Sequence, residues 1–395
     1  MKNFVPLPVI LTALAFWQTA AAADPKPPFG ENLQSRGHLN HARLQFEKNK
    51  KGTIAFIGGS ITEMDGYRPM VADLLKKRFP DTAFKFINAG IASTCSTTGA
   101  FRVGTDVLDQ GPVDLLFVEF AVNDDQDAFH TRAECIRGME GLIRQARRKN
   151  PHMNIVVTHF VNEGMLKTLQ SGKTPLTIEA HEAVTARYEV STINLAKEVA
   201  EEITAGQLTW QKYGGVHPAP FGNAIAAKMI DELFNRAWSE PSPPPAPPAG
   251  PVPLDPFSYS SGRFIDPKEA TVKNGWTLAV PDWKKLAGSK RDRFTAIPML
   301  SATEAGAEAT LAFEGTSVGA YIVAGPDAGI AEASIDGGTF QKVNLLHRYS
   351  GGLHYPRTVL LGTELKPGHH TLTLRISAET KSAGHAMRIM QFVAN

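Results

Sequence analysis

The stretch from Thr53 to Thr62, TIAFIGGSIT, joins an apolar run to a pair of glycines and a serine. The run TIAFI has the length and composition of a buried strand. Gly58 and Gly59 permit a sharp turn and close approach by a ligand, which would present Ser60 at the end of the strand. A Gly-Gly-Ser turn is also common without any function, so its meaning depends on the rest of the chain.

Further apolar runs follow this one, and helical patterns separate them. The expected strands are Ala83 to Ile87, Asp114 to Glu119, Asn154 to Thr158 and Ser191 to Asn194. The expected helices are Tyr67 to Lys77, Thr131 to Lys149, Thr177 to Tyr188, Leu195 to Ala205 and Phe221 to Asn235. This alternation predicts an α/β domain in three layers, a parallel sheet covered by helices on both faces. Ligands bind such sheets beyond the carboxyl ends of the strands.

Three residues stand at these strand ends or before the last helix. Gly90 follows the second strand, and Asn123 follows the third, where its side-chain amide is suited to donate to an oxyanion. His217 lies between a glycine turn and the last helix, which favours its neutral, basic form. Taken singly, a tight turn also explains Gly90, and an Asx turn is the more common explanation of Asn123. A lone histidine is usually structural, but the position of His217 favours a functional role.

In chain order, Ser60, Gly90, Asn123 and His217 resemble the four blocks of the SGNH, or GDSL-like, hydrolases. The resemblance covers about Thr53 to Phe234 and implies a flavodoxin-like fold and a serine esterase. It implies that Ser60 is the nucleophile and His217 its base. The N–H groups of Ser60 and Gly90 and the Asn123 side chain would form the oxyanion hole. No cofactor is implied, and no Cys/His cluster at ligand spacing predicts a metal site.

One position departs from this family. An aspartate usually stands three residues before the histidine, where this chain has Gly214. Three interpretations are open: a Ser60–His217 dyad with a backbone carbonyl orienting the ring, a carboxylate from elsewhere, or a degenerate site. Candidates for the second are Glu63, Asp65, Asp124 and Asp127. The dyad is favoured because every other block is intact.

The segment 239–256, SEPSPPPAPPAGPVPLDP, predicts an extended linker. It divides a hydrolase domain, residues 24–238, from an accessory domain, residues 257–395. The expected strands of the second domain are Ala309 to Phe313, Gly319 to Ala324, Ala331 to Ile335, Thr358 to Leu361, Thr371 to Ile376 and Met387 to Val393. They predict an antiparallel β-sandwich. The turn at Asp336 and the segment from His369 to Arg375 resemble the galactose-binding-like jelly rolls found beside some carbohydrate esterases.

Residues 1–23 have the layout of a signal peptide, with Lys2, an apolar run and small residues before Asp24. We therefore expect an exported protein, periplasmic or secreted, without a membrane span after cleavage. The alternative is a membrane anchor, which Pro6 and Pro8 disfavour. The net charge of +2, from 41 basic and 39 acidic residues, gives no reason to expect nucleic acid as a partner. Cys95 and Cys135 either form a disulfide or stay buried thiols, and the sequence leaves both open, as it does the oligomeric state.

Export, a hydrolase domain and a sandwich together predict an esterase that removes O-acyl groups, chiefly O-acetyl, from polysaccharide or oligosaccharide. One alternative is a lipid or aryl esterase, which the lack of an amphipathic lid segment disfavours. Another is a catalytically degenerate glycan-binding protein. Candidates for stacking on sugar rings, equally suited to a core, are Trp276, Trp283, Tyr321 and Tyr349.

Overall fold

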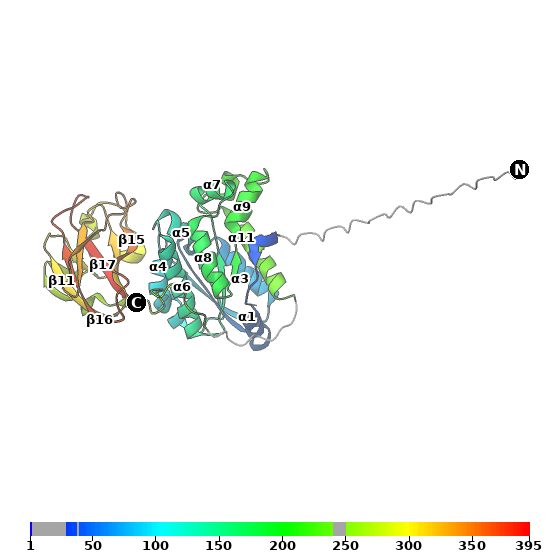
Figure 1. Ribbon diagram of the computed structural model, residues 1–395, viewed down its shortest axis with the longest axis horizontal. Helices are drawn as coiled ribbons and strands as arrows, with labels where there is room; N and C mark the ends of the chain where they lie inside the picture. The colour runs from blue at the N-terminus through cyan, green and yellow to red at the C-terminus, as the bar shows by residue number, and fades with distance from the viewer. Residues whose placement is uncertain (2–28, 38, 240–249) are drawn as a thin grey trace.

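The structure is a computed structural model that describes Met1 and residues 29–37, 39–239 and 250–395. An α/β part comes first in the chain and a β part follows it (Figure 1). The predicted signal peptide lies outside the described residues apart from Met1, and so do residues 240–249 of the predicted linker. Within the described segments, no helix is long and apolar enough to cross a membrane.

The α/β part is built on a six-stranded sheet in the order β1-β6-β5-β4-β2-β3. Its strands are β1 (Leu33–Gln34), β2 (Lys51–Gly58), β3 (Ala83–Gly90), β4 (Leu115–Glu119), β5 (Asn154–Thr158) and β6 (Ser191–Ile193). All neighbours pair in parallel except β1, which pairs antiparallel with β6 at the edge. The five predicted strands are present. The two-residue β1 makes the sheet mixed, and it is too short to leave a periodic signal in the sequence.

Helices cover both faces of this sheet, as the three-layer prediction requires. Ile54 and Phe56 point to one helical layer, while Ala55 and Ile57 point to the other, because side chains alternate along a strand. The first layer contains α1 (Asn40–Leu44), α3 (Tyr67–Arg78), α7 (Glu163–Gln170), α9 (Leu195–Thr204) and α11 (Pro220–Ala237). The second contains α4 (Ser96–Asp106), α6 (Arg132–Lys149) and α8 (Leu176–Arg187). The short helices are α2 (Ser60–Glu63), α5 (Ala121–Gln126), α10 (Trp210–Tyr213) and α12 (Asp292–Thr295).

The five predicted helices are present, but the sequence did not predict α4. Its first half, STTG, combines residues of modest or poor helix propensity, so no pattern favours a helix there. The residues from Ser96 to Val103 are all buried. Tertiary packing rather than local propensity therefore accounts for this helix.

The β part is an antiparallel sandwich, as predicted. One sheet has the order β15-β12-β17-β10-β9, with β7 beside β17, and the other has the order β14-β13-β16-β11-β8. The strands are β7 (Arg263–Ile265), β8 (Thr271–Asn274), β9 (Trp276–Ala279), β10 (Met299–Ala302), β11 (Glu308–Gly315), β12 (Val318–Ala324), β13 (Ile330–Ile335), β14 (Gln341–Asn344), β15 (Tyr355–Gly362), β16 (Gly368–Ile376) and β17 (Met387–Ala394). Side chains from both sheets form a single apolar core between them.

The two parts share an apolar contact on the side of α4 and α6. Phe101 of α4 packs on Tyr259, with ring centroids 5.0 Å apart, and Met139 of α6 belongs to the same buried cluster as Tyr321 of β12. Thr98 in α4 also meets Thr358 in β15 through their hydroxyls, 2.9 Å apart. The sandwich is thus packed against the second helical layer. The domain limits at 238 and 257 stay predictions.

The two cysteines are unpaired. Cys95 precedes α4, Cys135 lies in α6, and both thiols are free and buried. Of the two states that the sequence left open, the structure has the buried thiols.

Glu119 ends β4 with its carboxyl inside the protein. The side chain is fully buried, and neither oxygen has a hydrogen-bond partner among the described residues. Burial raises its pKa to about 8, because the nearby Gly59 N–H and Thr62 hydroxyl favour the charged form too weakly to offset desolvation. The native protein therefore holds this carboxyl as a neutral acid at pH 7.

We predict that Glu119→Gln makes stability less dependent on pH. The unfolded chain loses the Glu119 proton near pH 4.5 and the native protein near pH 8, so wild-type stability falls as pH rises between these values. Between pH 4.5 and pH 8, the free energy of unfolding of wild type should fall by on the order of a few kcal/mol more than that of the variant. Urea titrations at the two pH values measure this. The control, Glu163→Gln at the surface of α7, should follow wild type, and identical pH dependence in all three proteins would contradict the prediction.

Candidate active site

Ser60 and His217 come together at the carboxyl edge of the sheet. Ser60 is the first residue of α2, directly after the turn that ends β2. Its Oγ lies 2.8 Å from Nε2 of His217, although the two residues are 157 positions apart in the sequence. The Ser60 N–H belongs to the first turn of a helix, and it has no acceptor among the described residues. The structure thus forms the serine–histidine pair that the sequence predicts, with a free backbone donor beside it.

The two glycines before Ser60 are needed because other groups approach them closely. A Cβ on Gly59 would lie 1.9 Å from Oδ1 of Asn123, and one on Gly58 would lie 2.2 Å from Oγ1 of Thr62. Gly59 has φ −83°, so its backbone is not in the left-handed region. Missing side-chain volume is therefore one property that these glycines contribute.

Asn123 lies in α5, just after β4, with 2% of its surface exposed. Its Nδ2 donates to Oδ2 of Asp127 at 2.6 Å, and the second N–H of the amide has no acceptor among the described residues. Its Oδ1 also accepts no hydrogen bond there, so the side chain does not close an Asx turn. Burial raises the pKa of Asp127, which the hydrogen bond from Asn123 and the charge of Arg348 oppose. Asp127 thus fixes the amide and leaves one donor free.

Gly90 ends β3, where its N–H donates to Oδ1 of Asn88 at 2.9 Å. A Cβ on Gly90 would lie 2.3 Å from the backbone nitrogen of Glu63, so close approach of α2 explains the glycine. The Gly90 donor is therefore occupied, and its predicted role in the oxyanion hole stays a prediction.

Ser93, in the loop after β3, is a donor that the sequence did not predict. It has φ 70°, and its N–H has no acceptor among the described residues. The same loop lies against the nucleophile turn, because the N–H of Ile91 donates to the Gly58 carbonyl at 3.0 Å. Glycine or asparagine usually marks a left-handed residue, so a serine there carries no signal in the sequence.

Gly214 cannot be replaced by aspartate on this backbone. It has φ 109°, and a Cβ would lie 1.9 Å from the nitrogen of Ala219. Among the described residues, Ser60 is the sole hydrogen-bond partner of the exposed His217, whose Nδ1 contacts neither a carboxylate nor a backbone carbonyl. The geometry is that of a serine–histidine pair without a third member.

The four carboxylates proposed to replace the missing aspartate all bind other groups. Their partners are Arg293 and the Ala92 N–H for Glu63, Arg68 for Asp65, Ser96 and His181 for Asp124, and Asn123 for Asp127. None of them contacts His217 in the described structure. The interpretation of a borrowed carboxylate therefore finds no support in the geometry.

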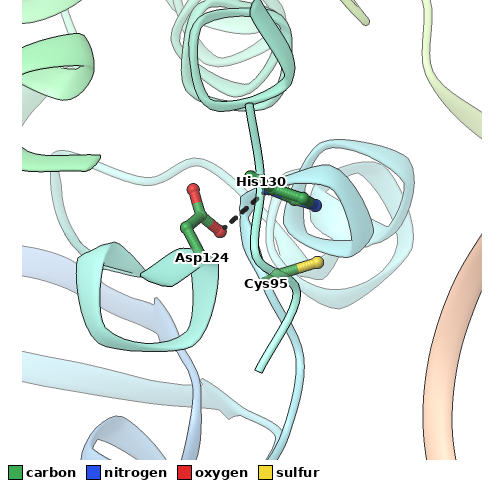
Figure 2. Close-up of side chains that lie close together, drawn as sticks. All are labelled: Cys95, Asp124 and His130. Atoms are coloured by element: carbon green, nitrogen blue, oxygen red, sulfur yellow. Dashed lines mark ion pairs between the residues drawn. The ribbon is translucent and has the colours of Figure 1, made fainter. Parts of the chain in front are cut away.

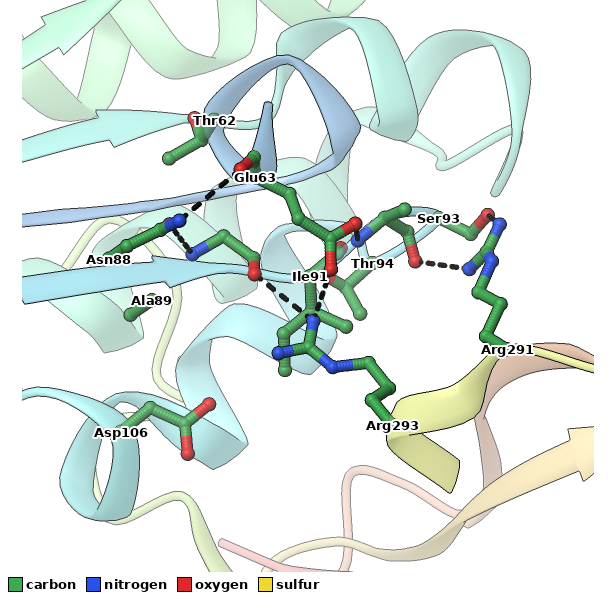
Figure 3. Close-up of polar contacts among 12 residues, drawn as sticks. Thr62, Glu63, Asn88, Ala89, Ile91, Ser93, Thr94, Asp106, Arg291 and Arg293 are labelled. Carbon is green, nitrogen blue, oxygen red and sulfur yellow. Dashed lines mark hydrogen bonds and ion pairs between the residues drawn. The ribbon is translucent and has the colours of Figure 1, made fainter. Parts of the chain in front are cut away.

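Two arginines of the β part hold the loop after β3 (Figure 3). Arg293 in α12 forms an ion pair with Glu63 and donates to the Gly90 carbonyl at 3.2 Å. Arg291 donates to the Ala92 carbonyl and to the Ser93 hydroxyl, both at 2.8 Å. The loop beside the nucleophile is thus fixed between α2 and the sandwich.

The four aromatic residues considered for sugar stacking differ in exposure. Trp276 and Tyr321 are buried, and Tyr321 stacks on Phe264, so these two are core residues. Trp283 is half-buried and packs edge-on against His354. Tyr349 alone among the four is exposed, at 43%. Only Tyr349 retains the accessibility that stacking on a sugar needs.

The fold also gathers residue types that bind metals, which the spacing in the sequence does not show. Cys95, Asp124 and His130 bring one ligand-type atom each within 4.8 Å of one another, and so do Asp124, Cys135 and His181. Asp124 is common to both groups, and its two oxygens already accept hydrogen bonds from the Ser96 N–H, the Ser96 hydroxyl and His181. A metal ion bound by either group would therefore have to compete with these hydrogen bonds for the Asp124 carboxylate.

Comparison with known proteins agrees with this geometry. Residues 56–225 match the model of the GDSL-like lipase/acylhydrolase family. Two crystal structures of a two-domain esterase (CEX) active on acetylated mannans, one with mannopentaose, have TM-scores of 0.74 and 0.72. Each is 22% identical over 92% of this chain and 97% of the esterase, a level that shows a common fold. A comparison with curated proteins gives no match. Residues 56–225 are therefore a domain of the GDSL-like lipase/acylhydrolase family, which an antiparallel β-sandwich follows in the chain.

Proposed function

We propose that this protein is an exported serine esterase that hydrolyses O-acyl esters, chiefly O-acetyl esters, on carbohydrate. The observation that carries the proposal is the 2.8 Å contact between Ser60 Oγ and His217 Nε2 at the carboxyl edge of the sheet. Family membership supports an ester hydrolase. The common fold with a two-domain esterase active on acetylated mannans supports an acylated polysaccharide or oligosaccharide as substrate.

In this proposal the reaction passes through an acyl-enzyme. Ser60 Oγ attacks the ester carbonyl carbon while His217 Nε2 takes the hydroxyl proton, and His217 then protonates the sugar oxygen as it leaves. A water molecule next attacks the acyl-Ser60 ester, with His217 again removing the proton, and the free acid departs. His217 is exposed, so solvent rather than a carboxylate stabilises its charged form.

The negative charge that develops on the carbonyl oxygen needs fixed donors. The Ser60 N–H and the free N–H of the Asn123 amide supply two of them. The loop after β3 supplies the third, either from Gly90, whose N–H must first leave Asn88, or from Ser93, whose N–H is already free. Asp127 is a positioning residue, since it orients the Asn123 amide.

Replacing either member of the pair should abolish hydrolysis. We expect Ser60→Ala and His217→Ala each to lower acetate release from acetylated mannan and xylan by roughly 10³-fold or more, because the acyl-enzyme cannot form. The control Ser171→Ala, at an exposed position after α7, should keep wild-type rates. Faster hydrolysis of long-chain esters than of acetylated glycans would favour a lipid esterase, and glycan binding without any turnover would favour a degenerate protein.

Asn123→Ala should lower turnover by ~10²–10³-fold with little change in KM, because the lost amide acts mainly in the transition state. Steady-state kinetics on p-nitrophenyl acetate measure the two constants separately. Asp127→Asn keeps the size of the orienting side chain, so we expect a smaller loss from it. Thermal melts establish that both variants fold, and near wild-type turnover in a folded Asn123→Ala protein would exclude this residue from the oxyanion hole.

Gly214→Asp should impair the enzyme, although it restores the usual aspartate of the family. The left-handed φ costs about 1–2 kcal/mol for a residue with a Cβ, and the contact with Ala219 adds to this. We expect both a lower Tm and a lower kcat than wild type. Gly215→Asn is the matched control, because its neighbouring site has φ 79° but open space for a side chain. A gain in kcat for Gly214→Asp would refute the steric argument.

A further inference from the structure

The cavity between the two parts contains a cysteine that the esterase reaction does not use. Cys95 precedes α4 and faces a cavity of about 280 Å³, whose walls come from the α/β part and from the sandwich. His130 and Asp127 line it on one side, and Tyr355 and Arg357 on the other. The residue is 8% exposed. The thiol is therefore sheltered, but it borders a space large enough for a small molecule.

Cys95 belongs to a chain of interacting side chains with His130 and Asp124. One ligand-type atom each of Cys95, His130 and Asp124 lies within 4.8 Å of the others, and Nδ1 of His130 lies 3.4 Å from Oδ1 of Asp124. Nε2 of His130 also contacts the Thr97 hydroxyl at 3.3 Å. Figure 2 shows the His130 ring next to the Cys95 sulfur, with the ion pair to Asp124 on the other side of the ring. Asp124 is itself fixed by Ser96 and His181. A carboxylate that orients and charges an imidazole beside a thiol is an arrangement that activates cysteine nucleophiles.

Two further features favour the negative form of this sulfur. Cys95 is the N-cap of the 11-residue helix α4, and its sulfur lies 3.6 Å from the Thr98 hydroxyl in the first turn of that helix. Arg357 is nearby, and its guanidinium has neither a hydrogen bond nor an ion pair with any described residue. Helix N-termini and neighbouring cations are the surroundings in which protein thiols ionise readily.

The balance of these effects differs between the two cysteines. Burial opposes ionisation of Cys95, but the charge of the neighbouring His130 outweighs it and holds the pKa of Cys95 below the ordinary value. Burial also opposes the charge on His130, yet Cys95 and Asp124 keep its pKa well above the ordinary value. Burial raises the pKa of Cys135, in α6, to about 12. The protein thus contains its own inert reference thiol.

We propose that Cys95 is an activated thiol and a site of covalent modification by small disulfides that enter the cavity between the two parts. The Cys95 sulfur attacks one sulfur of a disulfide RS–SR, and a new bond joins Cys95 to that RS group. The old S–S bond breaks, and its electron pair leaves with the second RS group as a thiolate, which takes a proton from His130. Cys95 is thereby oxidised and one RS group is reduced, so no further reagent is needed.

The same cavity adjoins the proposed esterase site. Asp127, which orients Asn123, lines the cavity, and the carbonyl of Asp127 contacts Nε2 of His347 at 2.8 Å. A group attached to Cys95 would occupy the space beside Asp127. We therefore expect modification to lower esterase turnover, a consequence that rests on the proposed function.

Several charged or titratable groups face Cys95 from the surrounding elements. They are His130, Asp124, Asp127, Glu134 and Cys135 in the α/β part, and His347, Tyr355 and Arg357 in the sandwich. The variants below therefore change the two nearby cations separately.

Alkylation by iodoacetamide tests the proposal on the full-length native protein, treated with EDTA and followed by mass spectrometry of the two cysteine peptides. A thiol of ordinary pKa, about 8.5, changes its labelling rate roughly 80-fold between pH 6 and pH 8. We expect a clearly smaller change for Cys95, because His130 and the first turn of α4 favour its thiolate form. Strong pH dependence at Cys95, or labelling only after denaturation, would overturn the proposal.

Two variants test the cause. His130→Gln should restore ordinary pH dependence and slow labelling at pH 6 by ~10-fold or more, and Arg357→Gln should slow it by a smaller factor. Arg357 makes no hydrogen bonds with described residues, so its replacement keeps the test informative if the His130 variant fails to fold. Ser171→Ala, at an exposed position after α7, is the control and should label like wild type. If neither cation affects the rate, the proposed activation is wrong.

The link to the esterase is tested with 2-hydroxyethyl disulfide. Wild type should form a mixed disulfide at Cys95, lose turnover and recover it with reductant, whereas Cys95→Ser should keep its activity. Modified protein with undiminished turnover would overturn the link. Labelling requires no esterase activity, so failure of the proposed function would be recognised separately.

Discussion

The close approach of backbone segments at the carboxyl edge of the sheet is the constraint on which the site depends. Oδ1 of Asn123 fills the volume that a side chain at position 59 would need, and the backbone of α2 fills the volume beside Gly90. These contacts hold the ends of three neighbouring strands, β2, β3 and β4, against one another. Any Cβ at either glycine would separate the serine from its neighbouring donors. The relative positions of the site residues therefore depend on the glycines, which have no side chain, as much as on the side chains that are present.

The sandwich also restrains the segments at this edge of the sheet, from outside the α/β part. Apolar packing against α4 and α6 fixes the position of the sandwich. From this position, Arg291 and Arg293 donate hydrogen bonds to the loop that follows β3. Loops that carry site residues usually have few contacts beyond their own domain. Here the loop is held by the sheet on one side and by hydrogen bonds from the two arginines on the other. The β part thus contributes to the order of the site, whether or not it contacts a substrate.

The sequence predicts the long periodic elements and the order of the site residues, because these follow from local patterns. Buried strands such as β4 and amphipathic helices such as α6 carry such a signal. The helix α4 does not, since its Ser, Thr and Gly residues become helical only through packing. The contact between Ser60 and His217 was expected from a resemblance, but the clash at Gly214 and the occupied N–H of Gly90 depend on distances that spacing cannot give. The free N–H of Ser93 and the group of side chains around Asp124 could not be predicted either, because both depend on contacts between segments that are distant in the sequence.

The loop that carries His217 has a consequence for how such enzymes change over time. The backbone at Gly214 has left-handed geometry and lies against Ala219, so a single codon change to aspartate yields a strained loop and not a better catalyst. A lineage with this backbone would need to remodel the whole turn from Tyr213 to Ala219 before an acidic residue there became useful. A site with a serine–histidine pair and a site with a serine–histidine–aspartate triad therefore require different backbone conformations in this turn. A comparison of related chains for catalytic type should consequently consider the length and glycine content of this turn before the identity of one residue.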